Sequence, residues 1–347
     1  MKKFTAIVLM GYPGSGKTRA SSNECLEFGD ALYLSSDELR VEMFGFRDQE
    51  HNKELFEELY KRAIDYSDKG NILIDSTALT RKDRLRVIAK LGKYFNMRLV
   101  VIIRPIWEIV EENQIRKVSK PEEYIPEPIF KQILGRFQLP TYGEGWDAIV
   151  FYFNSSHVGD NDSKSLIKCF YDLDKVEDIP HDNPHHQESI KEHVYYVLDK
   201  VKEESSSFVL ESIAYYHDLG KFYVIQYNEE KGYSQCIGHA AVSAYIYLTD
   251  FLVKAALDYV EKNDFNGSFN DLEFLLIFYG VYYHDYPYSF VNFEDMVRSL
   301  SKPSKPLVHL FGAVDNSLVG ISMREFTRML IDFNCYDRMR EGDSDDE

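Results

Sequence analysis

The first half of the chain alternates short apolar runs with stretches of mixed polarity. The apolar runs are residues 3–10, 31–35, 71–75, 98–103 and 147–153. Between the second and third runs, residues 52–66 place four apolar side chains on one face of a helix, namely Leu55, Leu59, Ala63 and Tyr66. Buried strands that alternate with helices predict an α/β domain, a parallel sheet with flanking helices, over residues 1–156.

The second half shows a different pattern. Residues 154–162 are polar and contain glycine, so we interpret 157–185 as a linker. Beyond it the periodicity predicts helices only, and therefore an all-α domain over residues 186–340. The acidic tail, 341–347, is typical of a disordered segment. The predicted helices are 187–202, 208–219, 240–260, 272–283 and 307–320.

Charge is divided unevenly between the halves. Residues 1–150 hold 23 Lys+Arg and 23 Asp+Glu, whereas residues 151–347 hold 17 and 34 and carry the whole net charge of −17. Nucleic-acid binding depends on positive surface, so a polyanion would be held by the first half. The acidity of the second half suits divalent cations, or it serves solubility alone.

Cysteines and hydropathy bear on the compartment. The four cysteines are scattered without a CxxC pair, which favours a reducing, cytoplasmic setting over a disulfide framework. We find no apolar run that approaches the length of a membrane span, so we expect no membrane association.

A phosphate-binding loop follows the first apolar run. Residues 11–18, Gly-Tyr-Pro-Gly-Ser-Gly-Lys-Thr, fit GxxxxGK[ST]. In this motif the backbone N–H groups of Gly11, Gly14, Ser15 and Gly16 wrap the phosphates of ATP. Lys17 is expected to reach the β- and γ-phosphates, and Thr18 to ligate Mg²⁺.

A second motif ends the third apolar run with Asp75. A carboxylate at the end of a buried strand is suited to the metal that accompanies the nucleotide. The alternative is that Asp75 caps the next helix.

Three further segments offer groups for phosphoryl transfer. Asp37 and Arg40 lie one helical turn apart after the second run, so Asp37 could accept a proton from a hydroxyl and Arg40 could bind an acceptor phosphate. The alternative is a helix cap with an exposed arginine. Arg84 either faces the site or belongs to a surface basic cluster. Arg116 precedes a proline-bearing loop, where a lid would lie, and could stabilise transition-state charge.

These motifs together resemble the kinase domain of phage-type polynucleotide 5′-kinases, over about residues 4–153. The matching residues are GSGKT (14–18), SSDELR (35–40), ILIDST (72–77), NQIR (113–116) and YGEGWD (142–147). The resemblance implies that Asp37 activates the 5′-hydroxyl of an RNA or DNA end, that Arg40 binds the neighbouring phosphate, and that Arg116 is the lid arginine. Glu112 departs from the family, which often has arginine there, and residues 75–78 read Asp-Ser-Thr-Ala rather than beginning Asp-Thr-Asn.

The second half carries histidines in apolar surroundings. His193 shares a helix face with Ile190, Val194 and Val197, and therefore points inward. His217 and Asp218 are adjacent near a helix end, where Gly220 offers a C-cap; both can reach one ion if the helix frays there. Imidazole with carboxylate suits Mn, Fe, Co, Ni or Zn. The alternative is a domain with ordinary core histidines.

This spacing resembles the HD-domain metal phosphohydrolases over about residues 186–320. The resemblance implies that His193, His217, Asp218 and Asp315 hold one metal, that His239 and His284 add a second, and that Lys221 steadies a substrate phosphate. Asp285 competes with Asp315 for the last ligand position, and His186 is an outside candidate.

The two resemblances together predict a bifunctional enzyme that heals nucleic-acid ends. One domain would phosphorylate 5′-hydroxyls and the other would remove a 3′- or 2′,3′-cyclic phosphate, which leaves ends that a ligase partner can join. One alternative is a small-molecule or nucleoside kinase fused to a nucleotidase. Another is a nucleotide-gated regulatory protein without catalysis.

Overall fold

The computed structural model divides into two compact units. It describes residues 4–21, 29–45, 50–157, 163–184, 188–262 and 271–289, with single positions from 296 to 333. Unit 1 comprises Met1–Pro126 and Gln138–Val158, and unit 2 comprises Glu127–Phe137 and Gly159–Glu347. The helix predicted at 307–320, the acidic tail, His186 and Asp315 lie outside the described residues.

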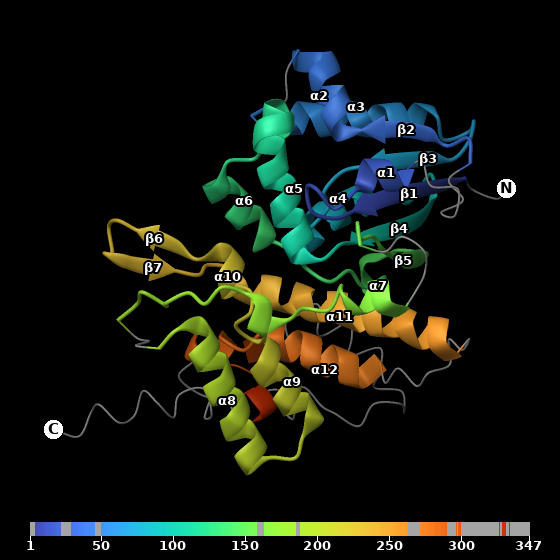
Figure 1. Cartoon of the computed structure of the whole chain (residues 1–347). Coiled ribbons are helices and arrows are strands. Elements are labelled where there is room, and N and C mark those ends of the chain that lie inside the picture. Colours follow the sequence, from blue (N-terminus) through green and yellow to red (C-terminus); the bar gives the residue numbers. More distant parts are fainter. Residues whose placement is uncertain are drawn as a thin grey trace. The chain divides into compact units, whose positions relative to one another are not determined.

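Unit 1 is built on a five-stranded sheet in which every printed pairing is parallel, in the order β2-β3-β1-β4-β5 (Figure 1). This confirms the predicted parallel sheet, and the apolar runs end where the strands end. In the central strand, Val8 pairs with Ile74 on one side and with Leu99 on the other. The strands are β1 Thr5–Met10, β2 Leu32–Ser35, β3 Ile72–Asp75, β4 Asn96–Ile103 and β5 Ala148–Phe153.

Helices flank this sheet because each presents an apolar stripe to it. On α3 the predicted face is buried through Leu55, Leu59 and Ala63. Ala20 of α1 packs with Ile7 and Leu9, where alternate residues of a strand point to one face of the sheet. The helices of unit 1 are α1 Lys17–Ser21, α2 Ser36–Phe44, α3 Asn52–Asp65, α4 Arg81–Leu91 and α5 Ile106–Ser119, with short 3₁₀ turns at Pro121–Glu123 and Tyr142–Glu144.

The strand order determines where a ligand can bind. The chain turns to β2 and β3 on one side of β1 and to β4 and β5 on the other, so the order reverses beside β1. In open α/β sheets the crevice at the carboxyl ends of the strands, at such a switch point, is the ligand site. The phosphate-binding loop follows β1 at that edge.

A buried ion pair joins α4 to the segment before β5. The side chains of Arg84 and Glu144 are both fully buried, with Arg84 Nε 2.7 Å from Glu144 Oε2. Arg84 also donates to the carbonyl oxygens of Leu79 and Leu139, at 3.0 and 3.4 Å, and Trp146 Nε1 donates to Glu144. Arg84 is therefore a structural residue, and neither sequence interpretation of it, a site group or a surface cation, is correct.

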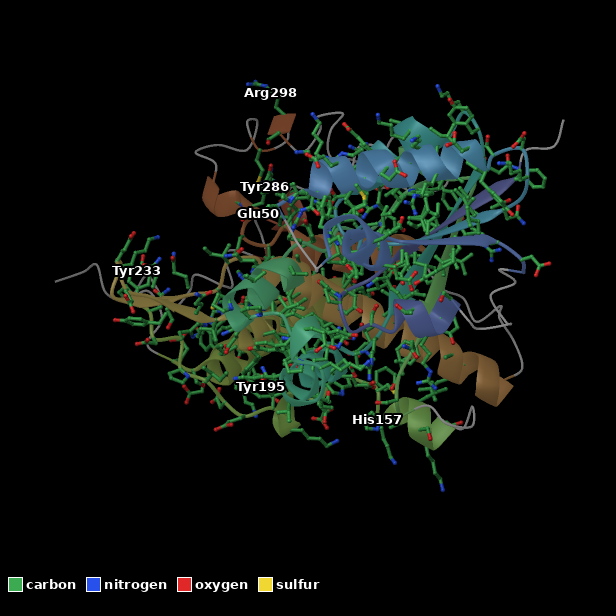
Figure 2. The ribbon with its side chains drawn as sticks, turned by 90° about the horizontal axis from the view of Figure 1, so that it is seen from above. Glu50, His157, Tyr195, Tyr233, Tyr286 and Arg298 are labelled. Atoms are coloured by element: carbon green, nitrogen blue, oxygen red, sulfur yellow. The ribbon has the colours of Figure 1, made fainter. Side chains whose placement is uncertain are left out.

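Unit 2 is mainly helical, as predicted. Its helices are α6 Glu127–Leu134, α7 Ser163–Ile167, α8 Ile190–Glu204, α9 Phe208–Tyr216, α10 Lys221–Val224, α11 His239–Lys262 and α12 Asp271–Tyr282, with 3₁₀ turns at Leu173–Lys175 and Tyr286–Ser289. The expectation of helices alone was wrong at one place. An antiparallel hairpin, β6 Gln226–Asn228 and β7 Tyr233–Gln235, lies between α10 and α11; Tyr233 of β7 is labelled in Figure 2.

Helix α8 begins with a capping box that the sequence encodes. The Ser189 hydroxyl accepts from Glu192 N, and the Glu192 carboxylate accepts from Ser189 N. The cap fixes the rotation of the helix, so that His193 is buried in line with Val194 and Val197. The predicted inward orientation of His193 is confirmed.

The segment 127–137 was expected within the first domain, but its contacts lie in unit 2. Lys131 Nζ donates to Ile225 O at 2.7 Å, and the Phe137 ring packs edge-on against Tyr245 with centroids 4.9 Å apart. The chain therefore enters unit 2 with α6, returns to unit 1 to form β5, and then enters unit 2 a second time.

Helix α11 contains one stretch, His239–Asp258, that is long and apolar enough to cross a membrane by length and composition. Our expectation of no such run was therefore wrong. Within the described residues, 61% of an apolar 18-residue portion of this stretch is buried. Burial inside the unit accounts for its apolar composition, because the core helix of a globular domain needs the same residues.

Candidate nucleotide site and metal centre

The phosphate-binding loop connects β1 to α1. Its start is fixed to the loop after β3, because Gly11 N donates to Thr77 O at 3.1 Å. Lys17 begins α1, and its Nζ donates to the carbonyl oxygens of Gly11 and Tyr12, at 3.0 Å each. Gly14 and Gly16 adopt left-handed backbone angles, φ 84° and 89°, which favour glycine.

Thr18 and Asp75 meet as the motif predicts. Thr18 Oγ1 donates to Asp75 Oδ2 at 3.0 Å, and the Tyr33 hydroxyl donates to the same oxygen at 2.9 Å. Asp75 is the last residue of β3, so the alternative of a helix cap is wrong. Hydroxyl and carboxylate oxygens are ligands that Mg²⁺ accepts, so this pair fits the ion that accompanies a nucleotide.

Charges from three other segments act on Lys17. Burial lowers the pKa of its ammonium group, Asp75 and Asp37 raise that pKa, and Arg116 lowers it. Electrostatic influence of this kind requires proximity. The candidates drawn from α2, β3 and α5 therefore gather around the same lysine.

Asp37 and Arg40 form an ion pair on α2. Arg40 Nη1 lies 3.1 Å from Asp37 Oδ1, and Arg40 Nη2 donates to Asn52 Oδ1 at the start of α3. Ser35, not Asp37, caps α2, so the cap interpretation of Asp37 is wrong. The Asp37 side chain is 56% exposed and that of Arg40 only 8%.

Arg116 lies on the last turn of α5, whereas we expected a flexible lid segment. Arg116 Nε is 3.2 Å from Glu112 Oε1 and 3.8 Å from Glu123 Oε2. The proline-bearing loop beyond is held to the same helix, because the Asn113 amide exchanges hydrogen bonds with the backbone of Ile125. Two carboxylates thus hold the candidate catalytic arginine.

In unit 2, four histidines and Asp218 form one buried cluster. The cluster contains two groups of three possible metal ligands, and Asp218 belongs to both. Within each group the ligand atoms all lie within 4.8 Å of one another: His193, His217 and Asp218 in the first, and Asp218, His239 and His284 in the second. His193 and His217 approach Asp218 Oδ2 at 3.4 and 3.3 Å. His239 and His284 approach Asp218 Oδ1 at 3.2 and 3.6 Å. The structure therefore brings together the five described residues of the predicted centre, and Asp315 lies outside the described residues.

Three histidine rings of the cluster are oriented by contacts between Nδ1 and backbone carbonyl oxygens. Nδ1 of His217, His239 and His284 faces the carbonyl oxygens of Ala214, Cys236 and Val281, respectively, at 2.7–2.8 Å. A carbonyl only accepts, so each Nδ1 carries the proton and each neutral ring turns an unprotonated Nε2 into the cluster.

These Nε2 atoms crowd one another. His217 and His193 are 3.3 Å apart at Nε2, and His239 and His284 are 3.1 Å apart. Asp218 Oδ1 is buried and makes no hydrogen bond among the described residues. Lone pairs packed this closely require a positive species between them, and an imidazole and carboxylate set fits a divalent transition metal. Burial lowers the pKa of His284, but Asp285 and Asp218 raise it well above the usual value, so the neutral ring described above requires the metal, and without it Nε2 would carry a proton.

Lys221 completes the cluster from the start of α10. Its Nζ lies 2.6 Å from Asp218 Oδ2 and 3.1 Å from Nε2 of the buried His181. Burial opposes the ionisation of Asp218, but Lys221 and His217 hold its pKa well below the usual value. Asp218 is therefore an anion, as a metal ligand requires.

The His-Asp doublet converges because α9 ends there. His217 is the C-cap of α9, so Asp218 leaves the helical path and turns to the same point. Gly220, which we expected as the C-cap, is instead the N-cap residue of α10. A Cβ at Gly220 would lie 2.1 Å from His239 O, so glycine is needed for the close approach of α11, which brings His239 to the cluster. Asp285 lies 3.3 Å from His239 Nε2 and 3.2 Å from His284 Nε2.

Residues 7–140 match the family model described as an AAA domain. The match covers the phosphate-binding loop and strands β2, β3 and β4, and less than half of the chain. No curated protein matches the sequence.

Solved structures similar to part of the chain include three kinds. APS kinase CysC of Mycobacterium tuberculosis, in complex with AMPPNP and APS, is 18% identical, with 49% of this chain and 98% of that chain covered and a TM-score of 0.33. A gluconokinase of Sinorhizobium meliloti is 15% identical, with 44% of this chain and 84% of that chain covered and a TM-score of 0.31. A chain of the Pnkp1/Rnl/Hen1 complex is 13% identical, with 46% of this chain and 82% of that chain covered and a TM-score of 0.29.

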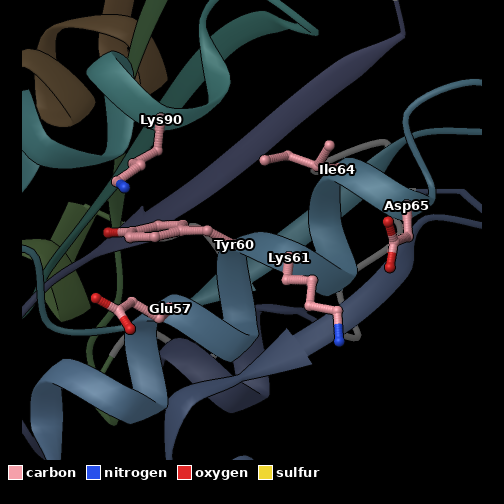
Figure 3. A pocket seen from close by; sticks show the side chains of 6 residues that line it. All are labelled: Glu57, Tyr60, Lys61, Ile64, Asp65 and Lys90. Atoms are coloured by element: carbon pink, nitrogen blue, oxygen red, sulfur yellow. The ribbon is translucent and has the colours of Figure 1, made fainter.

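A surface pocket of about 220 Å³ lies between α3 and α4 (Figure 3). The pocket is lined by Glu57, Tyr60, Lys61, Ile64, Asp65 and Lys90. None of these is a predicted site residue. Two lysines balance two carboxylates, so the pocket has no net charge with which to attract a phosphate, and we assign it no role.

Beside the metal centre, α11 carries a buried carboxyl group. Asp250 accepts from Tyr171 N at 2.9 Å and from the Tyr216 hydroxyl at 2.8 Å. Burial raises the pKa of Asp250 to about 7, although both hydrogen bonds act to lower it. Tyr216 precedes His217, so this carboxyl helps to fix the end of α9.

Proposed function

We propose that the chain heals nucleic-acid ends with two activities. Unit 1 transfers a phosphoryl group from ATP to a 5′-hydroxyl of RNA or DNA. Unit 2 uses a divalent transition metal to hydrolyse a 3′-phosphate, or a 2′,3′-cyclic phosphate by way of the monoester, so that inorganic phosphate is released and a 3′-hydroxyl remains. The observation that carries the kinase assignment is the hydrogen bond from Thr18 Oγ1, in the phosphate-binding loop, to Asp75 Oδ2 at the end of β3.

The residues of unit 1 have separate roles in this proposal. Bound ATP supplies the phosphoryl group, and Mg²⁺ held at Thr18 and Asp75 offsets its charge. Asp37, the exposed partner of its ion pair, accepts the proton of the attacking hydroxyl. Arg40 holds Asp37 in place through their ion pair, and Arg116 stabilises charge that develops on the transferred group.

Unit 2 supports the second activity through its cluster. A divalent ion there supplies Lewis-acid activation of water and phosphate. His193, His217, His239, His284 and Asp218 hold it, and Lys221, with His181 behind it, binds the substrate phosphate. The products, a 5′-phosphate and a 3′-hydroxyl, are the ends that a ligase joins, which suggests a ligase as the partner.

The test of the kinase is direct. A 5′-hydroxyl oligonucleotide, as RNA and as DNA, is incubated with radiolabelled ATP and Mg²⁺. We expect label on the oligonucleotide, loss of transfer in Lys17→Ala and Asp37→Asn, and normal transfer in Arg86→Ala, whose exposed side chain lies outside the site. Label on a nucleoside or sugar alone would replace the acceptor with a small molecule. Tight ATP binding without turnover would support a regulatory protein instead.

The phosphohydrolase is tested separately. We expect metal-dependent phosphate release from a 3′-phosphorylated or cyclic-ended oligonucleotide with Mn²⁺ or Ni²⁺. The double variant His217→Ala, Asp218→Ala should lose that release and retain the kinase. Equal loss of both activities would contradict independent sites, and no release with any metal would remove the second activity from the proposal.

A further inference from the structure

Two carbonyl groups in the middle of the phosphate-binding loop are each held by a side chain. Arg104 Nη1 donates to Gly14 O at 2.8 Å, and Asn154 Nδ2 donates to Ser15 O at 2.7 Å. Each donor is the first residue after a strand, since β4 ends at Ile103 and β5 at Phe153. The two strands are neighbours, and Asn154 N also donates to Ile103 O at 2.7 Å.

The arginine is itself held in place. Its Nε lies 2.9 Å from Oε2 of Glu108, one turn along α5. Glu108 is 1% exposed and accepts from the backbone and hydroxyl of Ser156, at 2.9 and 2.8 Å, and from the Ser155 hydroxyl. The residues after β5 therefore fix Glu108, which in turn fixes Arg104.

These contacts determine which way the loop amides point. In a trans peptide the C=O and the following N–H point in opposite directions. Holding Gly14 O and Ser15 O therefore fixes the directions of the N–H groups of Ser15 and Gly16, which point away from Arg104 and Asn154. Ser15 N–H closes the loop on Tyr12 O at 3.1 Å. A Cβ at Gly16 would lie 2.4 Å from Asn154 Nδ2, so the contact depends on glycine.

We propose that Arg104 and Asn154 are positioning residues that preorganise the phosphate-binding loop for the polyphosphate of a nucleotide. The inference rests on the proposed ATP site in unit 1 but does not depend on the acceptor. With both carbonyls held, binding does not have to reorient two peptide groups, so more of the interaction appears as affinity. Neither side chain needs to touch the nucleotide.

The experiment titrates the full-length chain with MgADP by calorimetry. The variants are Asn154→Ala, which removes one donor, and Arg104→Lys, which keeps the charge but loses the fork that spans Gly14 O and Glu108. We expect the dissociation constant to rise about tenfold in each, equivalent to about 1.4 kcal/mol. In the kinase assay the KM for ATP should rise while the KM for the acceptor stays constant.

Arg86→Lys is the matched control, since its side chain is 48% exposed on α4; its MgADP affinity should equal that of the wild type. Unchanged affinity in both test variants, with wild-type binding intact, overturns the inference alone. Absence of binding in the wild type removes the nucleotide site and the proposed kinase with it. If one variant fails to fold, as judged by circular dichroism, the other decides.

Discussion

Nε2 of His239 lies 3.1 Å from Nε2 of His284, and Nδ1 of each ring faces a backbone carbonyl oxygen. Two neutral rings in this arrangement have no proton to share between them. The contact is stable only with a positive species beside it, which a metal ion supplies without changing the tautomer of either ring.

Metal removal is therefore expected to destabilise unit 2. Because a metal that binds only the folded state adds to its stability, chelation should lower the melting temperature, and Mn²⁺, Co²⁺, Ni²⁺, Fe²⁺ or Zn²⁺ should restore it. Elemental analysis should find at least one transition metal per chain, and less in His239→Ala. The control is His157→Ala, an exposed histidine of unit 1. A wild-type chain with neither metal nor a metal-dependent melting temperature would contradict the centre.

Removal of the carboxylate that holds Arg116 should favour nucleotide binding. Arg116 must leave Glu112 and Glu123 to meet a phosphate, and a partly exposed ion pair contributes about 0.2–1 kcal/mol. We expect Glu112→Gln to lower the KM for ATP by up to about fivefold at low salt, with a smaller effect at high salt.

In contrast, Arg116→Ala should lower kcat by about a hundredfold or more, because it removes a charge that acts in the transition state. Steady-state kinetics with varied ATP and ionic strength separate the two effects. A raised KM for ATP in Glu112→Gln would show that the carboxylate positions Arg116 and does not restrain it.

The buried pair of Arg84 and Glu144 should dominate the stability of unit 1. Arg84→Met leaves the Glu144 carboxylate buried without its counter-charge, which costs about 3–5 kcal/mol. The double variant Arg84→Met, Glu144→Leu should recover part of that loss, because no charge is then left unpaired. Urea unfolding of the variants, with the exposed Arg86→Ala as control, measures this; a cost below about 1 kcal/mol for Arg84→Met would contradict it.

Asp250 makes stability depend on pH. Its pKa is about 7 in the folded chain against an ordinary 3.8, so the folded state binds the proton more tightly. The stabilisation from the protonated form is complete below about pH 4 and is lost as pH rises to about 7, with a slope of up to about 1.4 kcal/mol per pH unit.

Asp250→Asn keeps an acceptor for Tyr171 N and cannot ionise. The difference in unfolding free energy between this variant and the wild type should therefore grow, in favour of the variant, from pH 5 to pH 7 and then level off. A difference that stays constant with pH would contradict the raised pKa.

The sequence predicted those features that local pattern encodes. Each strand of unit 1 is a continuous apolar run, so the sheet could be read directly, and the phosphate-binding loop is a contiguous motif. The inward orientation of His193 followed from helical spacing. The β6–β7 hairpin escaped notice because its strands have three residues each, too few for an alternation to show.

Long-range contacts could not be read in the same way. Tyr33 and Asp75 are 42 positions apart, and Arg104 and Gly14 are 90 apart. They meet because of the order of the strands, which no local pattern specifies. His181 belongs to an irregular segment, and only the turn that presents it to Lys221 gives it a place beside the cluster of histidines around Asp218.

The path of α6 affects how this gene can be divided. Residues 127–137 pack with unit 2, whereas the residues on both sides of them belong to unit 1. A fragment that ends after β5 would keep residues 127–137 but lose Ile225 and Tyr245, which Lys131 and Phe137 contact. A fragment that begins at α7 would lose α6 itself. Neither unit is a single uninterrupted stretch of sequence, so no single cut of the chain gives two fragments that each carry one whole unit.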